Sequence, residues 1–281
     1  MNWIIFVILY LVVYVIFNFS YKVSTKTLTK AGSLTVLLEL IGAICALLMS
    51  TLFEFRFPTD IKVYICLGIT IIFYAIADRL NTTVRSGIEA STFSIINQLS
   101  TCFMTIAGFA FFKDPFVINK FIGAILIVLS NVLIFYKRGE GKINKYVGLG
   151  IIANLFFTLA LFFDVNISDN FNLGFYVTCT LGIPALIIMI FERVKLSDIK
   201  IEFQNGNKKF IFLTSLTWAG SIICQLKAYQ LGSVSIVAPL CALSVILNVL
   251  AGYIFLKERD NLVKKIISAL LIILGIILIK I

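Results

Sequence analysis

The sequence predicts an all-α membrane protein with ten transmembrane helices, arranged as two inverted five-helix repeats. The first reason is composition: 60% of the 281 residues are hydrophobic and 14% are charged, whereas soluble domains have about 45–50% apolar and about 25% charged residues. The second reason is that the apolar residues form long runs, and the third is that one stretch of the chain copies another. The mean hydropathy is +1.04. A chain this apolar has more apolar surface than a soluble fold can bury.

The copied stretch indicates how the chain is organised. TFSIINQLSTCFMTIAGFAFFKD (residues 92–114) aligns without a gap with IVAPLCALSVILNVLAGYIFLKE (residues 236–258), at a constant offset of 144 residues. A repeat with an odd number of spans must return in the opposite orientation, so the duplication predicts two inverted halves. We place the first half at residues 1–137 and the second at residues 144–281, with five spans each.

Ten apolar runs are candidates for helices that cross a bilayer core of about 30 Å. Runs such as ISALLIILGIILI are apolar on every face, whereas the strands of a membrane barrel alternate with a period of two. In chain order, the predicted spans cover residues 3–20, 33–53, 63–76, 90–112, 121–136, 146–163, 173–191, 210–226, 235–256 and 263–281.

The connections between the spans are mostly short, so consecutive helices are expected to be antiparallel neighbours. The first run lacks a basic leader and a cleavage site, and we expect it to be a retained helix. In the longest connection, residues 195–209, Asn205-Gly206 indicates a turn, so we expect an interfacial loop, with a short hairpin as the alternative. Ser86 and Glu89 have the spacing of a capping box that would begin the fourth span.

The basic residues indicate topology. The formal net charge is +10, and 18 of the 24 Lys and Arg residues lie in the odd-numbered gaps between spans or, for Lys264 and Lys265, at the very start of the span that follows. This distribution favours a protein in a lipid bilayer over a nucleic-acid-binding face, and no nucleic-acid partner is expected. The positive-inside rule places the odd-numbered gaps in the cytoplasm and both termini outside.

Several kinds of chemistry are excluded by residue type. The chain has no histidine, which removes Ser-His-Asp, Cys-His and HExxH chemistry. Its six cysteines lie in predicted spans without CxxC spacing, so we expect no disulfide framework, no metal and no cofactor. The spans show no cluster of ionisable residues at one depth, so we do not expect an intramembrane enzyme.

The repeat ends AGFAFFKD and AGYIFLKE, and the run LGSVSIVAPLCALSVILNVLAGYIFLKERDNL (residues 231–262), resemble the EamA repeat of the drug/metabolite transporter superfamily. The resemblance is strongest over spans eight to ten, clear over four and five, and weak over one, two, six and seven. It implies a substrate cavity lined by helices one, three, four, six, eight and nine, with five and ten at the periphery. It also implies cytoplasmic termini, against the positive-inside count, so the orientation stays open.

Uncharged polar residues within the spans are the first candidates for substrate contact, because each can donate and accept hydrogen bonds. They lie on helices that the resemblance assigns to the cavity. Hydrogen bonding between helices is the equally open alternative. These candidates are Asn18, Asn97, Gln98, Asn154, Gln225 and Ser244.

Aromatic residues form a second set of candidates. The offset of 144 relates Tyr74 to Trp218, which places them at pseudo-symmetric positions near the repeat interface, where transporters with inverted repeats bind their substrates. With Tyr14 as a third wall, these rings are suited to enclosing a cation or stacking on a ring. Packing against lipid or other helices is the alternative.

Four residues are candidates for coupling or gating. Glu39 is the only acid well inside a predicted span, and it is either a proton-coupling carboxylate or an interfacial glutamate paired with a lysine. Asp78 and Arg79 end the third predicted span, where they either form a gate or mark the exit of the helix from the membrane. Pro239 interrupts the ninth span and is a candidate hinge.

The resemblance and the repeat together predict a secondary active or facilitative transporter of a small metabolite, working by alternating access. Amino acids, amines, sugars and drug-like solutes are all open as substrates. The absence of a GxxxxGK[ST] motif favours a gradient or exchange as the driving force. We expect an integral multi-pass protein of the bacterial cytoplasmic membrane, with a homodimer as an open option. The alternative function is a non-transporting membrane scaffold or a lipid-handling membrane protein.

Overall fold

The computed structural model describes residues 3–100, 118–135, 145–232, 243–258 and 262–280, together with positions 103, 237, 240 and 241. Throughout these residues the regular structure is helical and no strand occurs. The α-helices are α1 (Trp3–Ser24), α2 (Ala31–Met49), α3 (Ile61–Gly87), α4 (Ala90–Ile96), α6 (Ile118–Phe135), α7 (Lys145–Ile167), α8 (Leu173–Phe191), α9 (Leu196–Asn205), α10 (Lys208–Leu231), α12 (Ser244–Phe255) and α13 (Leu262–Lys280). Short 3-10 turns follow α1, α2 and α7 at Thr25–Thr27, Ser50–Leu52 and Ser168–Asn170.

Within this part of the chain, six helices are long and apolar enough to cross a membrane: α1, α2, α3, α7, α8 and α10. The helix α12 is apolar but shorter. The all-helical fold predicted from the sequence is therefore confirmed. The number of ten spans stays a prediction.

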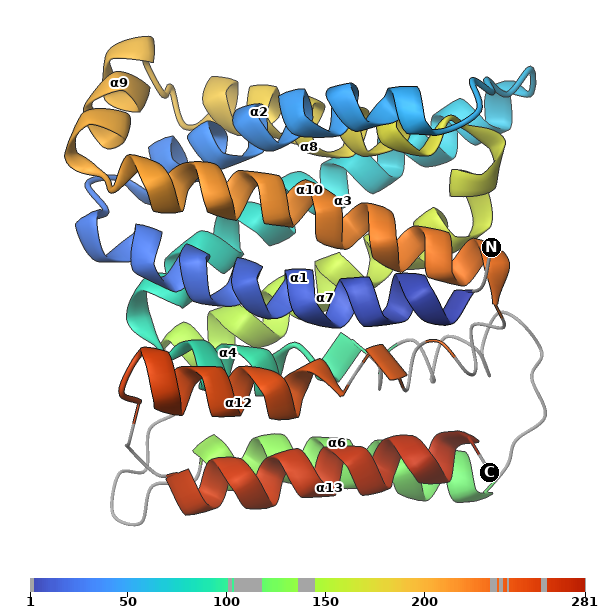
Figure 1. Cartoon of the computed structure of the whole chain (residues 1–281), viewed down its shortest axis with the longest axis vertical. Coiled ribbons are helices and arrows are strands. Elements are labelled where there is room, and N and C mark those ends of the chain that lie inside the picture. The colour runs from blue at the N-terminus through green and yellow to red at the C-terminus, as the bar shows by residue number, and fades with distance from the viewer. Residues whose placement is uncertain are drawn as a thin grey trace.

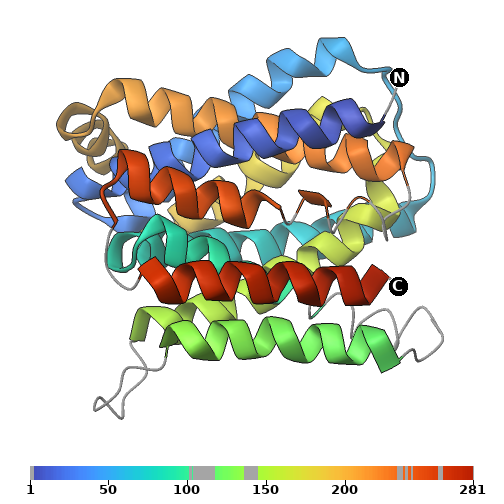
Figure 2. The same cartoon turned by 60° about the horizontal axis from the view of Figure 1, so that its bottom comes forward.

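The long helices lie side by side in one bundle and pack mainly in pairs (Figures 1 and 2). The helix α1 packs along α10, α3 along α7, α2 along α8, α4 against α12 and α6 along α13. The pair α6 and α13 forms an outer edge of the bundle in both views. The start of α1 and the end of α13 lie at the same end of the bundle (Figure 1), opposite the end that carries α9, which we call the α9 end.

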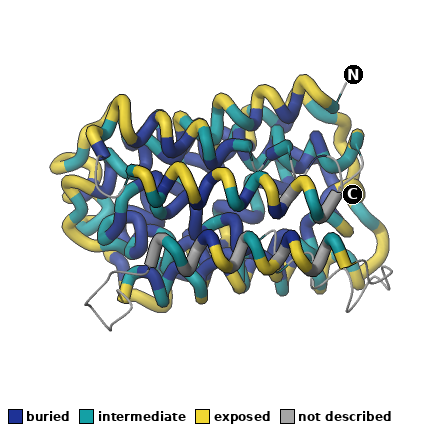
Figure 3. Tube along the Cα trace, turned by 90° about the horizontal axis from the view of Figure 1, so that it is seen from below, coloured by how far each residue is buried: buried dark blue, intermediate teal, exposed yellow. Residues whose placement is uncertain are grey.

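The exterior of the bundle is apolar, as a helix surrounded by lipid requires. Exposed segments follow the outer faces of the helices, and buried ones fill the interior (Figure 3). The exposed side chains include Ile8, Leu48, Ile190 and Leu270. Inside, Phe17, Tyr21, Leu181 and Trp218 belong to the largest buried cluster, which joins α1, α2, α3, α8 and α10.

The helix α3 is much longer than the sequence analysis predicted. We placed its end at residue 76, but it continues to Gly87. Asp78 and Arg79 therefore lie within the helix and do not end it. Asp78 and Arg85 are buried in the protein, so the helix continues past its apolar run without exposing either charge to lipid.

The connection before α10 also differs from the prediction, because residues 196–205 form the helix α9 and neither a loop nor a hairpin. The Asp198 carboxylate accepts a hydrogen bond from the Lys195 backbone N–H (3.3 Å) and pairs with the Lys30 ammonium (3.3 Å). These two partners hold the pKa of Asp198 below its ordinary value. The predicted turn at Asn205-Gly206 ends the helix.

The capping box predicted at Ser86 and Glu89 does not form. Ser86 lies within α3, and its hydroxyl donates to the Thr83 carbonyl (2.7 Å). Glu89 precedes α4, but its carboxylate forms a salt bridge with Lys265 (2.5 Å). The sequence spacing was right for a box, but a tertiary partner supplies the cap instead.

The first amides of α4 are capped by Glu258, which lies just after α12. Its carboxylate accepts hydrogen bonds from the N–H groups of Ala90 (2.7 Å) and Ser91 (3.1 Å). Lys257 has a positive φ of 57°, a left-handed conformation that turns the chain back after α12. A β-carbon at Gly252 would lie 2.6 Å from the Glu258 carboxylate, so glycine leaves room for the carboxylate in this position. We call this arrangement the Glu258 cap.

A second carboxylate binds the backbone immediately before α2. Glu202 of α9 accepts hydrogen bonds from the N–H groups of Thr29 (3.1 Å) and Lys30 (3.3 Å). Glu202 is 1% exposed, so it is held in the protein and not in solvent. We call this the Glu202 cap. Both caps lie at the α9 end and join segments more than 160 residues apart in the sequence.

Candidate functional site

A cavity lies inside the bundle, enclosed by α1, α3, α4, α7, α8 and α10. The volume open to the centre of a water molecule is about 60 Å³, which is room for more than one water. We call it the central cavity. Its lining residues are Tyr10, Tyr14, Phe17, Tyr21, Tyr74, Asp78, Asn81, Arg85, Asn97, Phe157, Leu161, Asp164, Thr180, Leu181, Trp218, Ser221, Ile222, Gln225 and Leu226.

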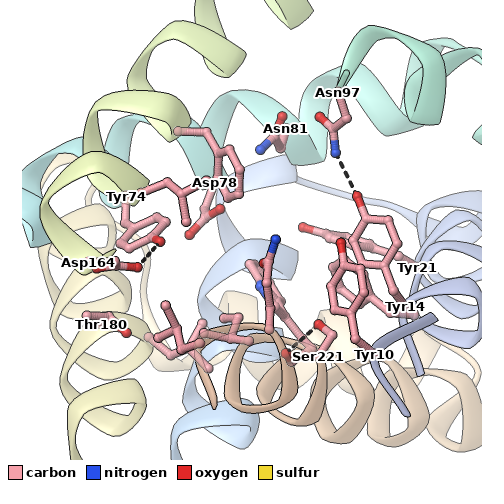
Figure 4. Close-up of a pocket in the computed structure, with 18 of the residues that line it drawn as sticks. Tyr10, Tyr14, Tyr21, Tyr74, Asp78, Asn81, Asn97, Asp164, Thr180 and Ser221 are labelled. Carbon is pink, nitrogen blue, oxygen red and sulfur yellow. Dashed lines mark hydrogen bonds between the residues drawn. The ribbon is translucent and has the colours of Figure 1, made fainter. Parts of the chain in front are cut away.

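Helical periodicity brings these side chains to one place. In α3 the lining residues are Tyr74, Asp78, Asn81 and Arg85, separated by steps of four, three and four. Residues at these steps lie on one face of a helix. The four lining residues of α1, at positions 10, 14, 17 and 21, have the same steps. Figure 4 shows the tyrosines of α1 facing Tyr74 and Asp78 across the cavity.

Aromatic rings make up one wall. Tyr10 and Tyr14 stack with their centroids 5.1 Å apart. The Trp218 ring lies 5.5 Å from the rings of both Phe17 and Tyr21. Because the rings are rigid and pack on one another, they hold the shape of this wall, and their side chains lose little conformational entropy on being fixed there.

A chain of amide hydrogen bonds joins three helices beside this wall. The Asn154 amide nitrogen in α7 donates to the Asn97 oxygen (3.1 Å), and the Asn97 nitrogen donates to the Tyr14 hydroxyl (2.9 Å; Figure 4). Asn97 directly follows α4. These bonds position Asn97 at the cavity while leaving the Tyr14 hydroxyl proton free for another acceptor.

Two carboxyl groups line the cavity. Asp164 of α7 is 1% exposed and accepts hydrogen bonds from the hydroxyls of Tyr74 and Tyr176, the latter at 2.5 Å. Asp78 of α3 is 5% exposed, and its carboxyl points toward the centre of the cavity (Figure 4). Behind it, the fully buried Glu39 of α2 lies close to Asp78, and neither of its carboxyl oxygens has a hydrogen-bond partner among the described residues.

One guanidinium lines the same cavity. Arg85 is 4% exposed. Its guanidinium carbon lies over three aromatic rings, at 3.8 Å from the ring centroid of Phe93, 4.5 Å from that of Tyr21 and 5.0 Å from that of Phe17. Its Nε and Nη1 atoms have no hydrogen-bond partner among the described residues. The cavity therefore combines aromatic faces, two carboxyl groups and one cation.

The structure brings six of the predicted site residues to the cavity lining: Tyr14, Tyr74, Asp78, Asn97, Trp218 and Gln225. Three others lie one contact behind the lining. Asn154 donates a hydrogen bond to Asn97, Ser244 lies beside Tyr10, and Glu39 lies close to Asp78.

The remaining predicted residues lie elsewhere. Asn18 and Gln98 are buried but do not line the cavity. Arg79 does not line the cavity either. It forms a salt bridge with Glu192, the residue directly after α8, and does not pair with Asp78. Pro239 lies outside the described residues.

The sequence analysis missed Arg85 and Asp164, which carry two of the charges in the cavity. Arg85 was counted with the topology signals, and Asp164 directly follows the residue at which we ended the sixth span. The steps of four, three and four that link Tyr74 to Arg85 are a signal that could have identified the longer helix. Among the described residues, no group of three or more His, Cys, Asp or Glu could hold a metal ion.

The model of the EamA-like transporter family matches residues 144–281. No curated protein matches the chain. The match begins where the sequence analysis placed the second repeat.

Proposed function

We propose that this integral membrane protein, whose residues 144–281 match the model of the EamA-like transporter family, carries a small polar metabolite across the membrane. Transport proceeds by alternating access of the central cavity to the two sides. The observation that carries the proposal is the cavity itself, because charged groups buried among membrane helices mark substrate and ion pathways. Asp78, Arg85 and Asp164 all line it.

The packing of the helices supports two inverted halves. In a chain of two five-span repeats, α1, α2, α3, α4 and α6 correspond to α7, α8, α10, α12 and α13. Under this exchange, the pair α1–α10 becomes α7–α3, which is the other long pair of the bundle. The pairs α2–α8, α4–α12 and α6–α13 each map onto themselves. A pseudo-two-fold axis through the bundle would produce this pattern.

The cavity wall supports the same axis. At the offset of 144 residues, Phe17 corresponds to Leu161, Tyr74 to Trp218, Asp78 to Ile222 and Asn81 to Gln225, and all eight line the cavity. Substrate sites of inverted-repeat transporters lie at the repeat interface. The equivalent positions differ in chemistry, because the acid Asp78 of the first half corresponds to the isoleucine Ile222 of the second. The shape is therefore repeated while the charge is not.

Glu39 and Asp78 provide a site for coupling. Two adjacent carboxylates repel each other in a low-dielectric interior, so a proton on either one relieves the repulsion. A cationic group of the substrate at Asp78 would have the same effect. Exchange of substrate for a proton or for a second solute follows from this competition, and the driving force is a gradient and not ATP.

The function is tested by counterflow. Purified protein in proteoliposomes is preloaded with one unlabelled solute from a panel of amino acids, quaternary amines, nucleosides and sugars, and uptake of the labelled solute is measured. We expect transient accumulation of at least one solute, lost in Trp218→Ala but kept in Trp3→Phe. If no solute of the panel accumulates and no thiol reagent reaches the cavity from water, a scaffold or lipid-handling role replaces transport.

The inverted architecture is tested separately with reporter tags inserted after Lys113 and Lys257, at the ends of the two repeat copies. We expect the tags on opposite faces of the membrane. Tags on the same face would overturn the inverted arrangement whatever the transport assay shows.

A further inference from the structure

The unpaired guanidinium of Arg85 is the feature of the cavity that the proposed function leaves unexplained. A buried cation is normally paired with an anion and hydrogen-bonded, because removing it from water is costly. Arg85 forms no salt bridge within 4.0 Å among the described residues, and its Nε and Nη1 atoms donate no hydrogen bond. The aromatic rings cover the flat face of the guanidinium and cannot satisfy its N–H groups.

The protein holds Arg85 in place through other groups. Its backbone carbonyl accepts a hydrogen bond from the Lys22 ammonium (2.7 Å), which also donates to the Ile88 carbonyl (2.6 Å). The stacked rings of Phe17, Tyr21 and Phe93 fix the plane of the guanidinium. A guanidinium with a fixed plane and free N–H groups is organised for an anion that accepts two parallel hydrogen bonds.

We propose that Arg85 binds the carboxylate of a zwitterionic substrate, whose ammonium group lies toward Asp78 and Asp164. This inference rests on the proposed transport function and names its substrate class. Asp78 lies on the same face of α3 as Arg85, about two helical turns earlier, and both side chains line the cavity. An amino acid or a betaine carries both groups, a carboxylate for Arg85 and an ammonium for the side of the cavity with Asp78 and Asp164.

The surrounding charges argue for one carboxylate and against a phosphate. A phosphate carries up to two negative charges, and it would enter a cavity that already contains two carboxyl groups. A zwitterion adds no net charge, and each of its ends meets an opposite charge. The ring of Trp218 and the tyrosines of α1 then remain for the ammonium or for an apolar side chain.

The test measures binding with the cavity's own tryptophan. The chain has two tryptophans, so Trp3→Phe leaves Trp218 as the only one, and its fluorescence reports ligands in the cavity. The probes are three matched sets, each with a zwitterion, its amine and its acid: glycine, methylamine and acetate; leucine, isoamylamine and 4-methylvalerate; phenylalanine, phenethylamine and 3-phenylpropionate. Inorganic phosphate is the competing anion.

We expect the zwitterion of at least one set to bind about tenfold or more tightly than its amine and its acid. Arg85→Gln should weaken binding of the zwitterion by about tenfold to hundredfold, as for the loss of a charge-assisted hydrogen-bonded pair. Binding of the amine should change by less than about threefold. Arg85→Lys keeps the charge but not the two parallel N–H groups, so its affinity for the zwitterion should lie between those of the native protein and Arg85→Gln.

Arg79→Gln is the matched control, because Arg79 lies on the same helix but pairs with Glu192 outside the cavity. It should leave all probe affinities unchanged. The proposal is overturned if no zwitterion binds, if the amine binds as tightly as its zwitterion, or if phosphate binds more tightly than acetate. Counterflow of an amine or a sugar that is unaffected by Arg85→Gln would overturn this substrate class while leaving the transport function intact.

Discussion

The side-chain nitrogen of Asn97 donates a 2.9 Å hydrogen bond to the hydroxyl of Tyr14. This bond joins the end of α4 to the middle of α1 at the wall of the central cavity. Asn97→Ala combined with Tyr14→Phe in a double-mutant cycle should show a coupling free energy of about 0.6 kcal/mol and no more than about 1.7 kcal/mol, the range for hydrogen bonds between membrane helices. Unfolding of the detergent-solubilised protein measures it.

Asn170→Ala is the control for this cycle, because its amide donates only to the Ile167 carbonyl in a local turn. It should show no coupling with Tyr14→Phe. Additive effects of Asn97→Ala and Tyr14→Phe would mean that this bond does not fix the position of α4 at the cavity.

The pair of Glu39 and Asp78 makes a prediction about pH. If the proton that drives exchange is held by this pair, Glu39→Gln should flatten the pH dependence of counterflow, because an amide cannot release a proton. The main effect of Glu39→Gln should be on the pH dependence of counterflow, and the counterflow rate at the optimal pH should fall only slightly. A Glu54→Gln variant, in which a highly exposed carboxylate is lost, should keep the native profile. An unchanged profile in Glu39→Gln would assign coupling to another group.

Accessibility of the cavity from water makes a third prediction. In a variant without the six native cysteines, Ser221→Cys places a thiol in the cavity wall, and a water-soluble thiol reagent should label it. A bound substrate should slow this labelling several-fold. Ser268→Cys in α13 is the control, since Ser268 is buried and donates to the Ser130 carbonyl of α6. Equal labelling of both thiols, without protection by substrate, would argue against a solute pathway here.

The Glu258 cap makes a prediction about stability. Glu258→Ala removes the acceptor for the first N–H groups of α4 and should lower the free energy of unfolding by about 1–2 kcal/mol, the usual loss for a helix cap. Glu258→Gln keeps one acceptor oxygen and should lose less. Glu54→Ala, which breaks only an exposed ion pair with Arg56, should change stability by less than about 0.5 kcal/mol. Similar stability of all three variants would show that α4 does not depend on the cap.

The sequence predicted the helices well where apolarity alone decides them. The runs at residues 173–191 and 263–281 agree closely with α8 and α13, because every face of these helices is apolar. The offset between the repeat copies also led directly to Tyr74 and Trp218, which share the cavity wall. In both cases the signal is carried by the chain itself and needs no knowledge of packing.

The sequence failed where a charge lies inside the protein. Hydropathy falls at Asp78, Arg85 and Asp164, so the analysis ended two spans near these residues, although the helices continue. Whether a charged residue leaves the membrane or turns inward depends on its neighbours on other helices, which one run of sequence does not reveal. The cap of α4 was missed for the same reason, since Glu258 is 168 residues away from Ala90.

Both carboxylate caps have an implication for a protein cut in two. Glu202 and Glu258 come from the second proposed half, and the helix starts that they cap belong to the first. A fragment of residues 1–137 made alone would leave those amides facing lipid headgroups without their acceptors. Co-expressed fragments should therefore reassemble through these contacts, whereas fragments with alanine at both glutamates should recombine poorly.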